Sequence, residues 1–258
     1  MTFLNDLDMI DYLDKAARLI RESGYTVAFT GAGISVESGI PPFRGKNGLW
    51  SRYDPKVLDL DYFYSNPHDS WVKIKEIFYD FFGKAQPNPG HIALAGLEQK
   101  GWLESVITQN IDNLHQEAGS KTVWEFHGNS QWVVCPRCGA RHFATEIDMS
   151  ELPPRCHEDG SVLKPDFIFF GEGIPREAYD QSFAAARKAE VMLVIGTTGE
   201  VMPASMVPYE AARSGATIIE INPETTPFTN QITHIFLEGK AGEVLPELLQ
   251  RVSQLIVD

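Results

Sequence analysis

The segment Thr26–Ser35 reads TVAFTGAGIS, a short and mainly apolar run that breaks into two closely spaced glycines. A run of this length bounded by glycine predicts a buried strand followed by a tight turn. Gly31 and Gly33 would let the backbone approach a diphosphate, as after the first strand of a nucleotide-binding fold. The third glycine of the dinucleotide fingerprint is absent, because Val36 stands in its place. An ordinary glycine-rich turn therefore remains an equal alternative at this point.

The same pattern, a short strand that breaks into a polar or glycine-rich tail, recurs along the chain. SVIT (105–108) runs into QNIDN, VMLVI (191–195) runs into GTTGE, and TIIEI (217–221) runs into NPE. Segments with helical spacing of apolar residues lie between these runs, as at 91–100 and 203–213. Short buried strands that alternate with helices predict an α/β fold with a parallel sheet covered on both faces. Ligands of such sheets bind at the carboxyl ends of the strands, where these tails would meet.

Two segments interrupt the alternation of strands and helices. Residues 46–87 are rich in aromatic residues and partly helical, and residues 131–161 carry the cysteines. We expect both to form one smaller module inserted into the sheet domain. The sheet domain would then comprise residues 1–45, 88–130 and 162–258.

The composition is that of an acidic protein with enough apolar residues for a packed core. Of 258 residues, 43% are hydrophobic, and 35 acidic against 22 basic residues give a net charge of −13. This charge opposes non-specific binding to nucleic acid or to an anionic membrane. Neither a signal peptide nor an apolar run long enough to span a bilayer is visible in the sequence. The chain has only three cysteines, two of them in a Cys-x-x-Cys pair, which suits a reducing compartment. We therefore expect a cytoplasmic protein with no membrane partner and no direct nucleic-acid partner.

The cysteines form half of a metal-site pattern. Cys135 and Cys138 are a tight pair in CPRCG, but the second half reads CHED from Cys156 instead of a second Cys-x-x-Cys. A zinc site with an acidic fourth ligand and a module that has lost its metal both remain open.

Two polar segments are candidates for a reaction centre. TQNIDN offers Gln109, Asn110 and Asp112 at a strand end, although an isolated Asn-x-Asp is usually turn chemistry. His127, in WEFHGN, lies between an aromatic residue and a glycine. That setting suits a half-buried general base as well as a structural histidine.

Taken together, the motifs resemble those of one family. GAGISVESGIPPFRG, TQNIDNLHQEAG, EFHG, FFGE, GTTGEVMPA, INPE and KAGEVLP occur in the order found in sirtuins, the NAD-dependent protein deacylases, from about residue 25 to residue 250. Each motif alone is ordinary, whereas the ordered set is highly specific. The resemblance implies a large Rossmann-like domain and a small domain with a zinc ribbon. NAD and an acylated lysine of a protein substrate would meet in the cleft.

The resemblance also implies roles for individual positions. At the diphosphate and nicotinamide ribose of NAD it implies Gly31, Ala32, Gly33, Phe43 and Arg44. On the nicotinamide side it implies Gln109, Asn110, Ile111 and Asp112. At the adenosine half it implies Gly196, Thr197, Thr198, Asn222, Lys240 and Ala241. Around the peptide, which would be added as a β-strand, it implies Phe170, Gly171 and Glu172 on one side and Glu200–Met202 with Val201 on the other. Thr198 is a mild departure, because family members often have serine there.

The implied chemistry consumes NAD. In sirtuin-like catalysis the acyl-lysine oxygen attacks C1′ of the nicotinamide ribose, nicotinamide leaves, and the products are free lysine and O-acyl-ADP-ribose. His127 would be the base for a ribose hydroxyl, while Asn110 and Asp112 would orient ribose and water. The rival functions are an NAD-linked oxidoreductase, an NAD glycohydrolase or ADP-ribosyltransferase on the same scaffold, and a non-catalytic NAD-sensing interaction protein.

Two finer expectations concern zinc and the acyl group. In the sirtuin pattern the fourth ligand of the structural zinc lies where Asp159 stands, which implies a site formed by Cys135, Cys138, Cys156 and Asp159. Such a site should bind zinc less tightly than four thiolates do. His157 is a competing ligand, but its position breaks the spacing. Family members that prefer succinyl or malonyl groups carry a Tyr-x-x-Arg pair, whereas Lys75 and Phe78 occupy the corresponding places here. Without that arginine we expect a small neutral or a fatty acyl group rather than a dicarboxylate.

Overall fold

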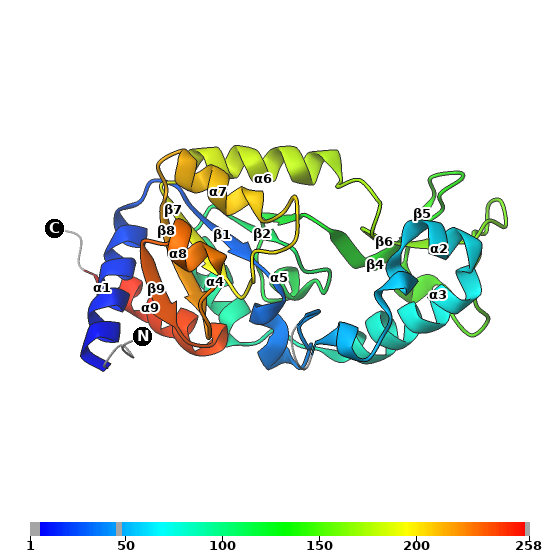
Figure 1. The fold of residues 1–258 in the computed structure, drawn as a ribbon, viewed down its shortest axis with the longest axis horizontal. Coiled ribbons are helices and arrows are strands. Elements are labelled where there is room, and N and C mark those ends of the chain that lie inside the picture. The colour runs from blue at the N-terminus through cyan, green and yellow to red at the C-terminus, as the bar shows by residue number, and fades with distance from the viewer. Residues whose placement is uncertain (1–5, 45–47, 256–258) are drawn as a thin grey trace.

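The computed structural model of the chain describes residues 6–44 and 48–255. It consists of two units that lie along the long axis of the molecule (Figure 1). The larger unit contains a six-stranded sheet, and the smaller unit contains a three-stranded sheet. Within the described residues, none of the helices combines the length and the apolar character that crossing a bilayer requires.

The larger sheet is entirely parallel. Its strands span Thr26–Thr30 (β1), Ser105–Thr108 (β2), Val123–Glu125 (β3), Val191–Ile195 (β7), Thr217–Asn222 (β8) and Ile235–Glu238 (β9). The order across the sheet is β3-β2-β1-β7-β8-β9, so the direction in which the chain adds strands reverses at β1. Open α/β sheets bind their ligands at such a switch point, beyond the carboxyl ends of the strands.

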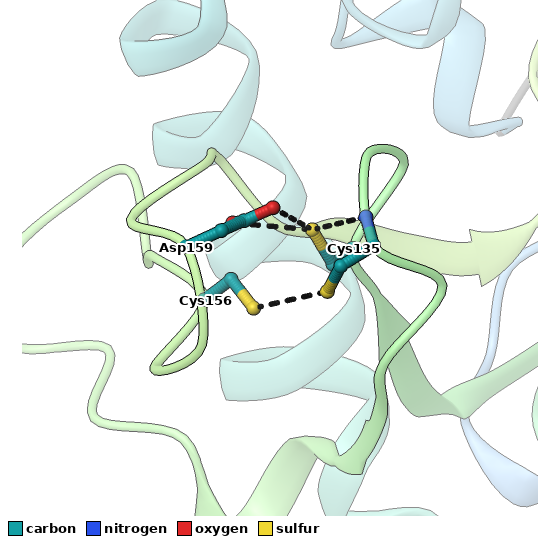
Figure 2. A group of neighbouring side chains, drawn as sticks. Cys135, Cys156 and Asp159 are labelled. Carbon is teal, nitrogen blue, oxygen red and sulfur yellow. Dashed lines mark hydrogen bonds between the residues drawn. The ribbon is translucent and has the colours of Figure 1, made fainter.

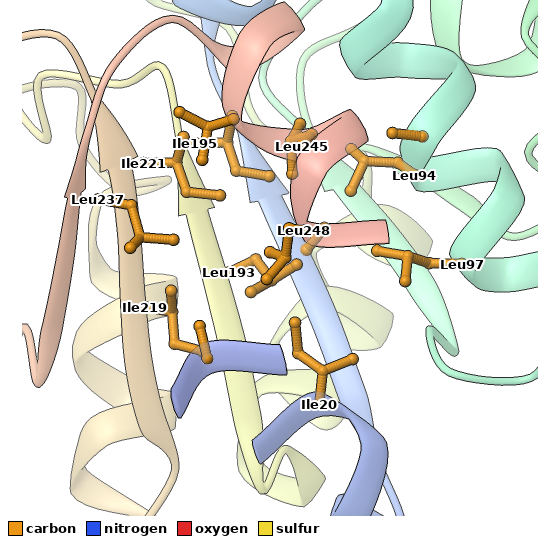
Figure 3. Close-up of a cluster of buried hydrophobic side chains, with 14 of the residues drawn as sticks. Ile20, Leu94, Leu97, Leu193, Ile195, Ile219, Ile221, Leu237, Leu245 and Leu248 are labelled. Carbon is orange, nitrogen blue, oxygen red and sulfur yellow. The ribbon is translucent and has the colours of Figure 1, made fainter. Parts of the chain in front are cut away.

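Helices cover both faces of this sheet. They span Asp6–Glu22 (α1), Pro89–Gln99 (α4), Leu114–Glu117 (α5), Arg176–Lys188 (α6), Met206–Arg213 (α7), Pro227–Gln231 (α8) and Ala241–Gln254 (α9). Side chains alternate along β1, so Ala28 packs with α1, α4 and α9, while Val27 and Phe29 pack with α6, α7 and α8. Figure 3 shows the first of these cores, with Leu245 and Leu248 of α9 directed at the strands. Burial on both faces explains why every residue of β1 and β7 is buried.

The fold class predicted from the sequence is confirmed, and the four predicted strands are β1, β2, β7 and β8. The glycine-rich stretch runs into a 3₁₀ helix, Ala32–Ser38. One local detail differs from the prediction. The helix expected from residue 203 begins later, because residues 201–205 form a turn in which the N–H of Ser205 donates to the carbonyl of Val201 (2.9 Å).

The smaller unit joins helices from one segment to a sheet from another. Its helices are α2 (Leu60–Ser65) and α3 (Pro67–Ile74), and its antiparallel strands are β4 (Gly128–Val134), β5 (Arg141–Phe143) and β6 (Lys164–Phe167), in the order β5-β4-β6. A π-helical segment, Lys75–Phe81, follows α3, and 3₁₀ helices span Leu49–Ser51, Pro55–Leu58, Phe82–Lys84 and Ala144–Glu146. The two segments meet in one core, where the indole N–H of Trp71 donates to the carbonyl of Leu163 (2.8 Å).

The structure places one stretch differently from the sequence-based division. Residues 162–258 were assigned to the sheet domain, yet β6 pairs with β4, and Leu163, Phe167 and Phe169 pack in the core of the smaller unit. Only the first residue of the apolar run FIFF (167–170) belongs to β6, so the run itself does not indicate which sheet this stretch joins. We propose that the second segment of the smaller unit runs from β4 to about residue 170.

Candidate active site and metal centre

The floor of the candidate site is a contact between the turns that follow β1 and β7. The N–H of Gly31 donates to the carbonyl of Ile195 (3.0 Å), and the N–H of Gly33 donates to the carbonyl of Gly196 (2.8 Å). A Cβ on Gly33 would lie 2.6 Å from the Cα of Gly196. One on Gly196, whose φ is +59°, would lie 2.5 Å from the nitrogen of Ile34. These glycines are therefore required for the close approach of the two turns.

A buried polar network rises from this floor at the end of β2. The amide of Asn110 donates to the carbonyl of Gly31 and to the hydroxyl of Ser35, both at 3.1 Å. The Ser35 hydroxyl in turn donates to Asp112 (2.7 Å), whose other oxygen accepts the N–H of Leu114 (3.1 Å). Burial raises the pKa of Asp112 against the opposing effect of these hydrogen bonds. Ser35 was missed in the sequence, where its place in GAGIS was the only signal.

His127 follows β3 and lies at the junction with β4. Its Nδ1 is 3.0 Å from the carbonyl oxygen of Gln109. A carbonyl can only accept, so Nδ1 carries the proton and Nε2 is the unprotonated nitrogen of the neutral ring. Burial lowers the pKa of His127, although the hydrogen bond to Gln109 acts in the opposite direction. The geometry therefore gives a neutral imidazole with one basic nitrogen.

The end of β7 brings two predicted adenosine-side residues together. The side chain of Gln109 donates to the Thr197 hydroxyl (3.0 Å), and the side chain of Asn222, at the end of β8, donates to the Thr197 carbonyl (3.0 Å). Thr197 is buried, whereas Thr198 is exposed. Three parallel strand ends are thus joined by amide side chains.

The start of α9 supplies the last pair of predicted nucleotide-side residues. Lys240 is exposed and pairs with Glu243 (3.1 Å), while Ala241 is buried at the first position of the helix. Next to them, the N–H of Gly242 donates to Glu37 (2.7 Å) of the 3₁₀ helix after β1. This contact ties the start of α9 to the glycine-rich segment.

Phe43 and Phe170 belong to a chain of aromatic contacts at the smaller unit. Phe43 is half-buried with its ring centroid 5.5 Å from that of Trp50, and Trp50 is 6.3 Å from Phe170. Phe170 keeps 45% of its surface exposed. Arg44 is exposed and makes no ion pair with any residue that the structure describes. The aromatic chain leads from the predicted NAD side to the predicted peptide side.

The predicted peptide-contacting segments follow β6 and β7. The main chain of Phe170 already pairs with the smaller unit, because its N–H donates to Leu58 (2.8 Å) and its carbonyl accepts from Leu60 (3.0 Å). Gly171, with φ +87°, makes no main-chain hydrogen bond within the described part of the chain. On the other segment, the half-buried Val201 has its carbonyl occupied by the turn described above.

Two buried histidines, His91 and His115, adjoin the polar network as packing and capping residues. The Nδ1 of His91 accepts the N–H of Asn88 (3.3 Å), the N-cap of α4. His115 contacts the Thr30 hydroxyl through Nε2 (3.0 Å). Burial lowers the pKa of His91 to about 4 and that of His115 well below its ordinary value. Both rings are therefore neutral in the folded protein at neutral pH.

The four predicted metal ligands come together in the smaller unit. The ligand atoms of Cys135, Cys138, Cys156 and Asp159 all lie within 4.8 Å of one another. The Cys135 sulfur is 3.5 Å from one carboxylate oxygen of Asp159, and the Cys138 and Cys156 sulfurs are 3.7 Å apart (Figure 2). Three thiolates and one carboxylate oxygen form a tetrahedral donor set that Zn²⁺ accepts. The residues present therefore fit a structural zinc ion.

The two halves of this cluster have the same backbone geometry. In the first, the N–H of Gly139 donates to the carbonyl of Cys135 (3.0 Å), and in the second, the N–H of Gly160 donates to the carbonyl of Cys156 (2.9 Å). Both glycines have positive φ values, +77° and +71°. Asp159 thus occupies a position equivalent to that of the second cysteine in a Cys-x-x-Cys-Gly turn. His157, the competing candidate, lies outside the ligand group and has its ring beside His142.

Comparison with known proteins gives one consistent result. The sequence model of the Sir2 family matches residues 31–203. An NAD-dependent protein deacylase of Thermococcus kodakarensis is 46% identical over 254 residues, which cover 95% of this chain and 98% of the relative.

Solved structures are similar over the same extent. A Sir2 homologue in complex with NAD has a TM-score of 0.87 and 40% identity, with 93% of this chain and 94% of that chain covered. A Sir2 protein with a deacetylated p53 peptide and 3′-O-acetyl-ADP-ribose has a TM-score of 0.86 and 38% identity, with 94% and 97% covered. Identity and coverage at this level leave one conclusion: the chain belongs to the Sir2 family.

Proposed function

We propose that the protein is an NAD-dependent protein-lysine deacylase that releases nicotinamide and O-acyl-ADP-ribose. Family membership supports the reaction class, and the observation that carries it to this chain is the geometry of His127. Its imidazole is neutral, its Nδ1 proton is fixed on the Gln109 carbonyl, and its Nε2 is free to accept a proton. Asn110 and Asp112 lie in the adjoining network.

NAD would bind across the floor formed by the turns after β1 and β7. This floor suits a dinucleotide because backbone without side chains lies beside neutral amides, and because the exposed guanidinium of Arg44, which forms no ion pair with a described residue, could bind phosphate. The residues that we propose to hold NAD are Gly31, Ala32, Gly33, Phe43, Arg44, Gln109, Asn110, Ile111, Asp112, Gly196, Thr197, Thr198, Asn222, Lys240 and Ala241. When bound, NAD supplies the ribose that accepts the acyl group and nicotinamide as the leaving group.

The chain itself contributes proton transfer and positioning. Nε2 of His127 would accept a proton from a ribose hydroxyl, while the Gln109 carbonyl keeps the ring in the tautomer that leaves Nε2 basic. Asn110 is held by Gly31 and Ser35 and would orient the ribose and water together with Asp112. These roles require no charged base at neutral pH.

The acylated lysine would arrive on an extended peptide between Phe170–Glu172 and the segment around Val201. The unpaired main chain of Gly171 supports this proposal, because an added strand binds through main-chain hydrogen bonds. We propose a neutral or fatty acyl group. Lys75 and Lys73 pair with Asp80 and Glu76, both at 2.7 Å, so a carboxylate would have to displace an existing partner to bind either lysine.

We further propose that a structural zinc ion is held by Cys135, Cys138, Cys156 and Asp159. We also propose that the protein acts in the cytoplasm and that it does not bind nucleic acid directly. The cysteines are free thiols placed for metal rather than for disulfides, which suits a reducing compartment. The net charge of −13 disfavours a polyanionic partner.

Mass spectrometry of one lysine peptide, incubated with NAD and carrying acetyl, fatty-acyl or succinyl groups, tests this function. We expect acyl loss together with equimolar nicotinamide and O-acyl-ADP-ribose, with acetyl removed faster than succinyl. Nicotinamide release without any change in peptide mass would instead indicate an NAD glycohydrolase, and transfer of ADP-ribose to the peptide an ADP-ribosyltransferase. Faster removal of succinyl than acetyl would contradict the proposed acyl preference alone.

A further inference from the structure

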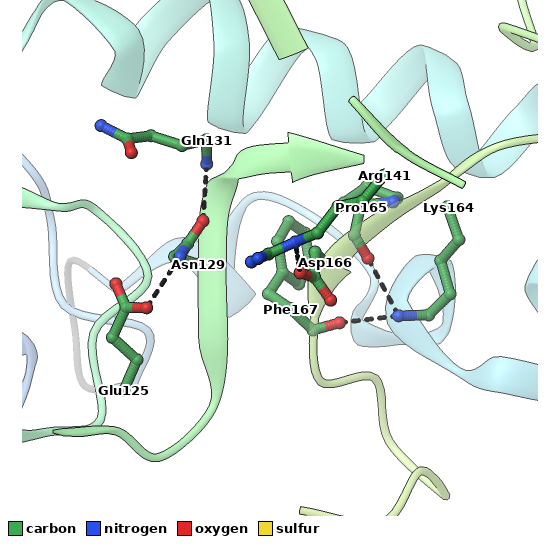
Figure 4. Close-up of polar contacts among 8 residues, drawn as sticks. All are labelled: Glu125, Asn129, Gln131, Arg141, Lys164, Pro165, Asp166 and Phe167. Carbon is green, nitrogen blue, oxygen red and sulfur yellow. Dashed lines mark hydrogen bonds and ion pairs between the residues drawn. The ribbon is translucent and has the colours of Figure 1, made fainter. Parts of the chain in front are cut away.

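Lys164 is a buried cation that the proposed reaction does not use. Only 4% of its surface is exposed. Its ammonium group donates to the carbonyls of Pro165 (3.0 Å) and Phe167 (2.7 Å), as Figure 4 shows, and pairs with Glu172 at 2.8 Å. An ammonium group has three N–H donors, so all of its hydrogen-bonding capacity is used.

The partner of this cation closes a turn. The same Glu172 oxygen that pairs with Lys164 also accepts the N–H of Phe169 (2.9 Å), while the N–H of Glu172 donates to the carbonyl of Phe169 (3.0 Å). The ammonium of Lys164 lies 4.2 Å from the centroid of the Phe169 ring. Lys164 thus fixes both ends of the turn from Phe169 to Glu172 relative to β6.

This turn connects the candidate base to the proposed peptide edge. The N–H of Ile168 donates to the carbonyl of His127 (2.9 Å), and the main chain of Phe170 pairs with Leu58 and Leu60. Gly171, whose main chain is open, lies between Phe170 and Glu172. A shift of the turn would therefore move the open edge relative to His127.

Stability alone does not account for a buried ion pair here. The side chain of Lys164 is only 5% exposed, whereas that of Glu172 keeps 28% of its surface exposed. Taking a charge such as that of Lys164 out of water costs free energy that its attraction to a partner barely recovers, and apolar residues of similar volume often replace buried ion pairs without loss. Fixed geometry is the property that the pair provides and that an apolar contact does not, because each donor of Lys164 is directed at one acceptor.

We propose that Lys164, acting through Glu172, is a positioning residue that sets the conformation of Phe170–Glu172 for the acyl-lysine peptide. This inference rests on the proposed deacylase function. It concerns binding of the peptide and not of NAD, because Lys164 contacts no residue of the proposed NAD site among the residues that the structure describes.

The test compares Lys164→Met with wild type in steady-state deacylation, with KM determined separately for acetyl-peptide and for NAD. Methionine keeps the length and apolar stem but loses the charge and all donors. We expect KM for the peptide to rise about tenfold or more, with KM for NAD unchanged and kcat changed by less than about threefold, because a hydrogen bond to a charged group is lost. Lys164→Arg, which retains a cation, is expected to recover part of the peptide affinity.

Two further variants keep the test decisive. Arg141→Gln removes a neighbouring but exposed ion pair, Arg141 to Asp166 at 2.7 Å, and should leave both KM values unchanged. If Lys164→Met does not fold, Glu172→Gln is measured instead, with the same expected split between the two KM values. An unchanged peptide KM in the folded variant, or equal losses for peptide and NAD, overturns the inference. A wild type that deacylates no peptide at all overturns the proposed function instead.

Discussion

His127 is held in one tautomer by the main chain and not by another side chain. The Gln109 carbonyl fixes the proton on Nδ1 and cannot itself take that proton. No carboxylate stabilises the protonated ring through this contact, and burial lowers the pKa of His127. A base of this kind is ready at neutral pH without first losing a proton. The arrangement suits a step in which a weakly acidic hydroxyl must be activated.

Replacing His127 with alanine is expected to reduce acyl-peptide turnover by a factor of about 10²–10⁴, the usual contribution of a positioned general base. NAD should still raise the Tm of the variant as it does for wild type, since the glycine floor is unchanged. His68→Ala, at an exposed histidine of α3, is the matched control and should retain full activity. Near-normal deacylation by the His127 variant would show that another group is the base.

At the scale of elements, the start of α4 depends on a buried histidine. Asn88 caps the helix, because its side chain accepts the N–H of Gly90 (2.9 Å). In return, Nδ1 of His91 accepts the main-chain N–H of Asn88. The His91 ring also lies within 3.4 Å of the Ser35 hydroxyl, so the helix cap adjoins the polar network of the site. Protonating this ring would place a charge in a dry environment and remove the capping acceptor.

Stability is therefore expected to fall on acidification. The folded-state pKa of His91 is about 4, below the ordinary value of 6.5, so the unfolded chain binds more protons between these values. The neutral His91 ring therefore adds about 3 kcal/mol to the free energy of unfolding above about pH 6.5, and this stabilisation is lost as the pH falls toward 4. Chemical denaturation at several pH values measures it. His91→Gln keeps a capping-box acceptor and should flatten this dependence, leaving the part due to His115; an equally steep dependence in that variant would contradict the assignment.

The elements that sequence predicts well are those whose signal is local. β1, β2, β7 and β8 are short apolar runs ending in glycine or polar residues, and their alternation with helices along the chain was enough to predict the parallel sheet. β3 and β9 escaped prediction because they are short edge strands. The sequence alone places residues 162–258 in the sheet domain and does not predict β6, which pairs with β4, because a pairing partner has no local signal.

The same distinction applies to single residues. The order of the motifs pointed to His127, Asn110 and Asp112. In the structure Asn110 and Asp112 both hydrogen-bond to Ser35, and His127 hydrogen-bonds to the carbonyl of Gln109, the residue before Asn110. Ser35 and Lys164 were not predicted, because a serine after a glycine-rich turn and a lysine before a proline have no distinctive local signal. Their roles come from contacts with residues far away in the chain or across a turn.

At the scale of the whole molecule, the metal centre joins parts of the smaller unit that are separate in sequence. Cys135 and Cys138 lie in the turn between β4 and β5, whereas Cys156 and Asp159 lie in the loop before β6. Apolar packing holds the same region, since Trp132 stacks on Phe143 with ring centroids 3.8 Å apart. The ion would therefore lock two loops that already rest on a packed sheet.

Elemental analysis of protein purified without chelator is expected to give about one zinc per chain, held less tightly than in an Asp159→Cys variant. Cysteine at this position completes four soft donors without altering the backbone, because both turns have the same geometry. The variant should resist chelator at higher concentrations, followed by metal release and by loss of near-ultraviolet circular dichroism. Asp159→Asn, which loses the negative charge, should release zinc more readily. A wild type that is metal-free, fully folded and active would refute the zinc assignment.

The floor beneath the proposed nucleotide consists of backbone resting on backbone. Side chains can change rotamer to suit a ligand, but the contact of Gly31 and Gly33 with Gly196 contains no side chain that could rearrange. The contact between these glycines therefore has no rotamers with which to adjust its shape to a ligand. Adaptation to a ligand would then fall to residues outside this contact, such as Phe43 and Arg44, which we propose to hold NAD and which follow the 3₁₀ helix Ala32–Ser38 instead of lying on the sheet. Discrimination between related nucleotides would be altered by changing these residues, whereas a change in the floor would abolish binding of all of them together.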